Sequence, residues 1–128
     1  MKPIRVYPAG PINGGDVLKT LANIENGIRA TADLLDQGYA PFPVFSDFLV
    51  VMRLPNLRIE QVYAYSLAWL ECSEAVLMLE GWENSHGAQH EHVKAEGLGI
   101  PVFYSMDDLN GWRDAQERAE KVMARSDD

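Results

Sequence analysis

The feature that most constrains the fold is a run of five apolar residues at positions 75–79, AVLML, with no polar residue on either face. An uninterrupted apolar strand is typical of the middle of a parallel sheet that is covered on both faces. Parallel strands need long crossover connections, which are usually helices. The run therefore predicts an α/β fold.

Segments of strand length alternate with segments of helical periodicity along the chain, as expected of βαβ units. Further strands are expected at residues 4–9, 39–43 and 100–104, and helices at residues 16–37, 58–72, 85–98 and 106–123. The first helix carries a stripe that we expect to pack on the sheet: Val17, Leu21, Ile24, Ile28, Ala32 and Leu35. The prediction is a small doubly wound (Rossmann/flavodoxin-like) parallel sheet of four to five strands with helices on both faces. One domain is expected at residues 1–124, followed by a polar tail at 125–128.

The composition and charge of the chain exclude several classes of binding partner. The 128 residues carry a net charge of −8 and no basic cluster, which argues against binding to nucleic acid polymers or to anionic membranes. The sequence has no apolar stretch long enough to span a membrane, and its start lacks the apolar core of a signal peptide. Its single cysteine cannot form an internal disulfide. We expect a cytoplasmic protein whose partner is a small molecule.

Doubly wound sheets bind ligands outside the carboxyl ends of their strands. The loop GPINGG, residues 10–15, follows the first strand and lies at that edge. Its glycines match neither the dinucleotide pattern G-x-G-x-x-G nor a P-loop, so no cofactor is expected. A turn explains these glycines, and a backbone pocket for a smaller phosphate or a sugar is the alternative.

Glu91 is the most informative single residue. In a helix that begins near Ser85, it shares a face with Ala88, Ala95 and Leu98, and this face is expected to pack toward the sheet. An ionised carboxylate there is costly unless it is paired or used. Glu91 is therefore either a structural residue, paired with an arginine or a tyrosine hydroxyl or emerging at the sheet rim, or a functional carboxylate near the ligand edge.

The start of that helix has two compatible interpretations. Ser85 is a good N-cap, because its hydroxyl can accept a hydrogen bond from a free backbone N–H. The same hydroxyl, the amides of Gly87 and Ala88 and the helix dipole can together form an anion site. His86 and His90 are four residues apart, but no third ligand has suitable spacing, so no metal site is expected.

The connector at residues 45–57, FSDFLVVMRLPNL, is more apolar than a solvated loop requires. It either lines a base pocket or forms a dimer interface, and Trp82 has the same two interpretations. Asp47 is the lone acid of this connector. It either reaches a ligand or caps a turn.

Two motifs resemble a known superfamily. Residues 7–12, YPAGPI, resemble its Y-x-A-G-P-I opening, and residues 81–95 resemble its signature G-W-x-x-S-x-G-x-x-x-E-x-x-x-A. This is the nucleoside 2-deoxyribosyltransferase-like superfamily, which includes the deoxynucleoside 5′-monophosphate N-glycosidases and many small bacterial and phage proteins. The resemblance spans most of the chain, from the first strand to Tyr104.

The resemblance implies a chemistry. In the superfamily, the glutamate that matches Glu91 attacks the anomeric carbon of a deoxyribonucleoside and displaces the base, and the resulting ester passes its sugar to another base or to water. Tyr7 is expected to orient Glu91. Six residues before the glutamate, transferases of free nucleosides usually carry Asp, whereas the monophosphate glycosidases carry a Ser that helps to bind the 5′-phosphate. Ser85 occupies this position, so the leading expectation is an N-glycosidase of a (deoxy)nucleoside 5′-monophosphate.

The expected substrate-binding residues lie in the loops described above: Gly10, Pro11, Ile12, Asn13, Asp47, Trp82, Ser85, Gly87 and Ala88. Phe45 and Phe48 are expected to surround the base together with Trp82. The loop GPINGG is similar to the G-S-I-R-G-G loop of the monophosphate glycosidases, but Pro11 and Asn13 replace its Ser and Arg.

The chain also departs from the superfamily. An aspartate usually lies about 25 residues before the nucleophile, whereas residues 63–66 of this chain read YAYS and contain no carboxylate. Either Asp47 or Tyr65 takes over its role, or the protein binds nucleotides without turning them over efficiently. The alternatives are therefore a deoxyribosyltransferase of free nucleosides and a non-catalytic nucleotide-binding or sensing module. Because neighbouring subunits commonly complete sites in this superfamily, we expect a homo-oligomer (dimer or tetramer).

Overall fold

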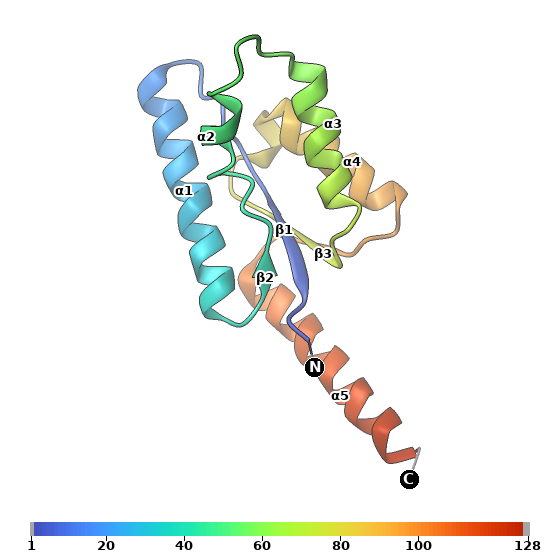
Figure 1. Ribbon diagram of the computed structural model, residues 1–128. Coiled ribbons are helices and arrows are strands. Elements are labelled where there is room, and N and C mark those ends of the chain that lie inside the picture. Colours follow the sequence, from blue (N-terminus) through green and yellow to red (C-terminus); the bar gives the residue numbers. More distant parts are fainter. Residues whose placement is uncertain (1, 127–128) are drawn as a thin grey trace.

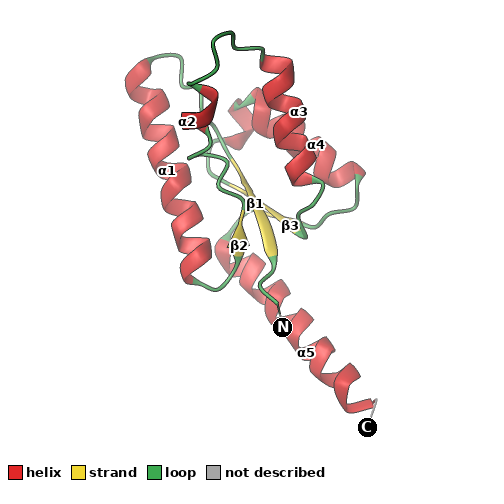
Figure 2. Ribbon diagram, in the orientation of Figure 1, coloured by secondary structure: helices red, strands yellow, loops and turns green. Residues whose placement is uncertain are grey.

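The computed structural model describes residues 2–126 and contains one four-stranded, all-parallel sheet with the strand order β2-β1-β3-β4 (Figures 1 and 2). The strands are β1 (Arg5–Ala9), β2 (Ala40–Pro41), β3 (Ala75–Met78) and β4 (Val102–Phe103). The helices are α1 (Val17–Asp36), α2 (Phe48–Val51), α3 (Ile59–Leu70), α4 (His86–Gly97) and α5 (Met106–Ser126), with a 3-10 turn, η1, at Trp82–Asn84. The predicted doubly wound α/β fold is confirmed.

Helices cover both faces of the sheet, and two apolar cores result. On one face, Leu34 of α1 and Leu109 of α5 pack against Val6 of β1 and Leu77 of β3. On the other face, Leu70 of α3 and two alanines of α4 pack against alternate residues of the same strands. Every residue of β3 is buried, as the uninterrupted apolar run predicts.

The strand order places a topological switch point between β1 and β3. After β1 the chain passes through α1 to β2 on one side, and α3 then returns it across the sheet to β3. The register pairs Tyr7 with Val76 and Ala9 with Met78, so β1 and β3 end side by side. The loops that leave these two ends diverge, and such a crevice is where doubly wound sheets bind ligands.

The prediction of which face of α1 packs against the protein is wrong. Val17, Leu21 and Leu35 are exposed, whereas Gly27 and Leu34 are buried against the rest of the protein. Beside Leu34, the inner face of α1 carries Gly27, where the helix comes close to Phe45, and the polar residue Asn23, which bonds the β1–α1 loop. The apolar stripe faces outward.

The last helix is longer than expected. α5 continues through Ser126 and extends past the sheet (Figure 1), so the expected polar tail at 125–128 begins inside the helix. Residues 127 and 128 of that tail lie outside the described residues. In the part of the chain that the structure describes, no helix combines the length and the apolar character needed to cross a lipid bilayer.

Candidate active site

A cavity of about 360 Å³ lies at the carboxyl edge of the sheet, bounded by the β1–α1 loop, α2, α3 and α4. Its walls are mainly apolar, with Phe48 and Val51 of α2 and Val62 and Leu67 of α3 among them. This volume is within the range of small-molecule sites. Among the described residues that line it are two carboxylates, Asp47 and Glu91, and no lysine or arginine.

Glu91 lies in the second turn of α4, on the face that it shares with the buried residues Ala88 and Ala95. Leu98, which was expected on the same face, is exposed because it follows the end of the helix as its C-cap. Its Oε2 atom is buried, while other parts of the side chain reach the cavity. Burial raises the pKa of Glu91 to about 7, and the hydroxyl of Tyr7 limits that rise. The carboxylate is thus withdrawn from water and open to a cavity, and a tyrosine hydroxyl lies beside it, so both interpretations of Glu91 keep a structural basis.

Tyr7 lies beneath Glu91, in the middle of β1, with no exposed surface. Its ring stacks on Phe42 at a centroid separation of 5.7 Å, and Phe42 in turn stacks on Trp69 at 5.4 Å. Burial, and next the charge of Glu91, raise the pKa of Tyr7 far above its ordinary value. Tyr7 therefore remains a neutral hydroxyl.

The Tyr7 hydroxyl and the Glu91 carboxylate are close neighbours but do not form a hydrogen bond of normal geometry. Neither Tyr7 Oη nor Glu91 Oε2 forms a hydrogen bond of normal geometry with the described residues, yet each influences the pKa of the other. Ser66 of α3 also acts on Tyr7, lowering its pKa as a hydrogen-bonding neighbour. A buried hydroxyl beside a buried carboxylate oxygen can orient that carboxylate, which is the role expected for Tyr7.

The start of α4 has the predicted cap. Ser85 Oγ accepts a hydrogen bond from Ala88 N at 3.2 Å, so the serine is the N-cap and is not among the residues that line the cavity. Gly87 and Ala88 do line it. A side chain at position 87 would project toward the ring of Tyr63, with Cβ at 3.5 Å from its edge. The first turn of α4 thus presents backbone to the cavity.

The β1–α1 loop brings Gly10, Ile12 and Asn13 to the cavity, while Pro11 faces a separate hollow beside α1. Gly10 is required where β1 meets β3, because a Cβ there would lie 2.9 Å from Cβ of Leu79. Polar residues on the inner face of α1 hold the loop. Asn23 Nδ2 donates to Ile12 O at 3.1 Å, and Gly14 N donates to Thr20 Oγ1 at 2.9 Å.

Asp47 precedes α2, but its side chain makes no capping hydrogen bond. Its Oδ2 atom instead accepts a hydrogen bond from Tyr65 Oη at 2.6 Å, and both residues line the cavity. This bond raises the pKa of Tyr65 to about 12. The two residues considered as substitutes for the missing helix aspartate are therefore a bonded pair on one wall.

Two of the expected aromatic residues lie elsewhere. Trp82 stacks on His92 at a centroid separation of 4.5 Å and does not line the cavity. Phe45 is buried against Gly27 of α1. Both rings fill gaps between helices and neighbouring segments, so of the three expected aromatics only Phe48 lines the cavity.

The sequence did not single out Tyr63 and His90 as a pair, yet their rings stack at 5.5 Å on the cavity wall. The sequence held a signal for both residues. His90 directly precedes Glu91, and Tyr63 lies one helical turn before Leu67, so each is close along the chain to a residue expected on an inner helix face. His86 is not among the lining residues. Within residues 2–126, no three histidine, cysteine, aspartate or glutamate side chains gather in a metal-binding cluster.

A protein-family model described as a domain of unknown function (DUF4406) matches residues 4–104. The match covers most of the chain, and the chain belongs to this family. It includes every cavity residue named above and ends just before α5. No curated protein matches the chain.

Proposed function

We propose that the protein is a glutamate-dependent N-glycosidase that cleaves the base–sugar bond of a (deoxy)nucleoside or its 5′-monophosphate. The observation that carries this proposal is Glu91, a carboxylate whose pKa burial raises to about 7 and which faces an apolar cavity at the switch point of the sheet. Functional carboxylates commonly combine a raised pKa with a position in a cleft. The motifs around Glu91 and Tyr7 resemble those of glycosyl-transferring enzymes and support the same assignment.

In the proposed reaction, a Glu91 oxygen forms a bond to the anomeric carbon of the sugar. The bond from this carbon to the base nitrogen breaks, and its electron pair leaves with the base, which takes up a proton. Water then attacks the same carbon and loses a proton, so that Glu91 is released and the free sugar forms. The Tyr7 hydroxyl aligns the carboxylate, and the apolar walls limit the access of competing water.

The 5′-phosphate is the part of the substrate for which the cavity offers least. Among the described lining residues, the donors are neutral groups, such as the Gly87 backbone N–H at the start of α4 and the side chains of Asn13 and Ser66, and none is a lysine or arginine. Two carboxylates in the same cavity repel a phosphate. This charge distribution favours a second candidate function, the transfer of a deoxyribosyl group between free nucleosides.

A panel of nucleosides and their 5′-monophosphates tests the proposal, with free base measured by chromatography. We expect the wild type to release base and the rate to fall as the pH is lowered through about 7, because Glu91 must be ionised to attack. Glu91→Gln should lower the rate by at least about 100-fold, since it removes the nucleophile. Glu83→Gln, an exposed change in η1, is the matched control.

The outcomes separate the candidates. Base release at the wild-type rate by Glu91→Gln contradicts the glutamate mechanism. Exchange of base when a second base is supplied, with no advantage from a 5′-phosphate, identifies the transferase. A nucleotide that raises the melting temperature without any base release over hours identifies a binding module.

The proposal includes a homo-oligomer. The exposed apolar residues of α1 and α2 support it: Val17, Leu18, Leu21, Leu35, Leu49 and Val50. Exposed apolar side chains that gather on a helix often mark an interaction surface, and a second copy of the chain would cover them.

A further inference from the structure

We propose that Asp47, held by Tyr65, recognises an exocyclic amino group of the substrate base, so that the cavity selects nucleosides with amino-bearing bases over their oxo counterparts. This inference rests on the proposed function, because it assigns the base-recognition group of the same cavity.

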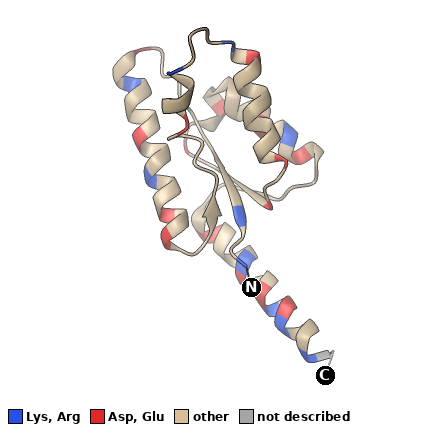
Figure 3. Cartoon of the chain, in the orientation of Figure 1, with Lys and Arg blue, Asp and Glu red and all other residues tan. Residues whose placement is uncertain are grey.

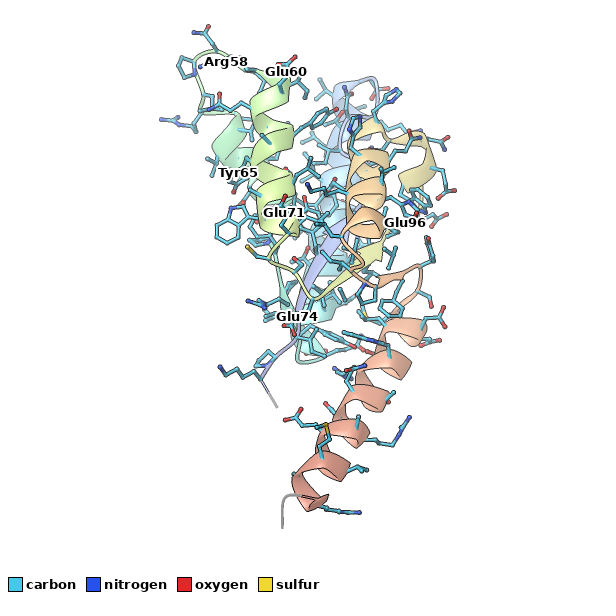
Figure 4. The ribbon with its side chains drawn as sticks, turned by 90° about the vertical axis from the view of Figure 1, so that its right-hand side faces the viewer. Arg58, Glu60, Tyr65, Glu71, Glu74 and Glu96 are labelled. Carbon is cyan, nitrogen blue, oxygen red and sulfur yellow. The ribbon has the colours of Figure 1, made fainter. Side chains whose placement is uncertain are left out.

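The first support is that the Asp47 side chain bonds a residue of the cavity wall and does not cap its own helix. Asp47 stands at the N-cap position of α2, where an aspartate normally bonds the backbone of the helix, but no such bond is present. Tyr65 Oη donates to Oδ2 at 2.6 Å instead. Figure 4 shows Tyr65 on the side of α3 toward α2, so the hydroxyl reaches across from one wall element to the next.

The second support is the remaining hydrogen-bonding capacity of the carboxylate. An ionised carboxylate has acceptor sites on both oxygens and no donor. Tyr65 occupies a site on Oδ2, and within the described residues Oδ1 accepts no hydrogen bond. Asp47 is half-buried and lines the cavity beside the apolar side chains of Phe48 and Val51. A ligand in the cavity that donates a hydrogen bond can use the free acceptor sites of this carboxylate.

The third support is the charge of the cavity. Its described lining contains Asp47 and Glu91 and no lysine or arginine, and α2 carries no charged residue (Figure 3). No protein cation competes for Asp47, so the matching group must come from the ligand. An amino group supplies two N–H donors, whereas a carbonyl oxygen in the same place would meet the carboxylate with its own lone pairs.

The position of Asp47 assigns it to the base rather than to the sugar. Glu91 marks the anomeric carbon, and it enters the cavity from α4. Asp47 enters from the segment before α2, whose Phe48 and Val51 provide the apolar surface on which a planar base can lie. The hydrogen bond from Tyr65 fixes the carboxylate at that wall, so Tyr65 is a positioning residue.

The test compares matched ligands that differ in the exocyclic group and in the protonation of the adjacent ring nitrogen: cytidine with uridine, and adenosine with inosine, each also as the deoxynucleoside and as the 5′-monophosphate. In wild type we expect the amino member of each accepted pair to have the higher kcat/KM, by about 10-fold or more, because hydrogen bonds to charged groups carry that much discrimination. Binding is measured in parallel in the Glu91→Gln background by the shift in melting temperature, so that selectivity can be read without turnover.

Two variants test whether the preference for the amino base depends on Asp47 and on its bond from Tyr65. Asp47→Ala should reduce the preference for the amino member to about 2-fold or less, and Tyr65→Phe should reduce it partly, since the carboxylate remains but is no longer fixed. Asp36→Asn, at the end of α1 away from the cavity residues, is the matched control and should leave the preference intact. Melting temperatures without ligand check that each variant folds. If Asp47→Ala does not fold, Tyr65→Phe and Asp47→Asn provide the same comparison.

The results distinguish this inference from the proposed function. Amino-selective binding that depends on Asp47, without base release, supports the inference and contradicts the glycosidase. Base release with equal efficiency for both members of each accepted pair, or a preference unchanged in Asp47→Ala, overturns the inference and leaves the glycosidase intact. Failure of every nucleoside and every 5′-monophosphate to bind overturns both.

Discussion

Glu91 combines two properties that a surface glutamate lacks. Its Oε2 atom is buried, and its side chain still opens on a cavity. Burial disfavours the charged form, which is why the pKa of Glu91 rises to about 7. The protein therefore holds at neutral pH a carboxylate that is partly protonated, at a cost that should be visible in its stability whatever reaction it performs.

The first prediction follows from this pKa. Because the folded-state pKa of about 7 lies above the ordinary value of 4.5, the folded protein holds the Glu91 proton more tightly than the unfolded chain does. The contribution of Glu91 to stability is therefore favourable at low pH, falls as the pH rises from about 4.5 to about 7, and stays constant above that. Glu91→Gln should gain roughly 1 to 3 kcal/mol relative to wild type between pH 5 and pH 8.

Urea unfolding of both proteins at pH 5 and pH 8 measures this difference. Glu83→Gln, whose carboxylate is exposed, should show no such change with pH. An equal stability difference between Glu91→Gln and wild type at the two pH values would falsify the raised pKa.

At the scale of helices and strands, the sequence predicted correctly the elements that are determined by residues close together in the chain. The apolar run predicted β3, and the Ser85 cap and the spacing of Ala88, Glu91 and Ala95 predicted α4 and most of its inner face; Leu98, expected there too, is exposed. The inner face of α1 was not predictable in this way, because hydrophobic periodicity assumes that the more apolar face is the buried one. In α1, close packing requires Gly27 and the β1–α1 loop requires polar partners, and neither requirement produces an apolar stripe.

The cavity was predictable in part for a related reason. Cavity residues that belong to one continuous motif, such as those around Gly10 and Glu91, were predicted from the sequence alone. The bond between Asp47 and Tyr65 joins residues 18 positions apart on different elements, and only the tertiary arrangement reveals it. Trp82 was misplaced because its position in the segment does not show which side of α4 the ring covers.

A second prediction concerns the contact between α1 and the segment that carries Asp47. A Cβ at position 27 would lie 2.2 Å from ring atoms of Phe45, which is buried and cannot move freely. Gly27→Ala should therefore destabilise the protein by about 1 to 2 kcal/mol, although glycine to alanine in a helix ordinarily stabilises by up to about 1 kcal/mol. Displacement of Phe45 should also weaken ligand binding, because Asp47 follows two residues later.

Thermal unfolding checks this prediction. Gly111→Ala in α5 is the matched control, since a Cβ there meets nothing within 4 Å, and it should be neutral or stabilising. A Gly27→Ala protein as stable as Gly111→Ala would contradict the close packing of α1 on Phe45.

At the scale of the whole molecule, the apolar surface is distributed unevenly. The outer side of α1 carries Leu18, 81% exposed, and Val17, 74% exposed, and α2 carries Leu49, 68% exposed. In the view of Figure 1, both α1 and α2 lie toward the left of the molecule, and α2 also walls the cavity. An assembly through this side would cover apolar surface and bring a second copy close to the entrance of the cavity.

The last prediction tests that assembly. Leu18→Glu combined with Leu21→Glu places two charges on the exposed stripe of α1, where the side chains make little contact with the fold, so the monomer should retain its stability. If a second copy covers the stripe, wild type should sediment as a dimer or larger species at micromolar concentration and the double variant as a monomer, because buried unpaired charges are strongly unfavourable. Val93→Glu, an exposed apolar residue of α4, controls for added charge and should sediment as wild type does. A monomeric wild type would contradict the homo-oligomer, and an oligomeric double variant would move its interface away from α1.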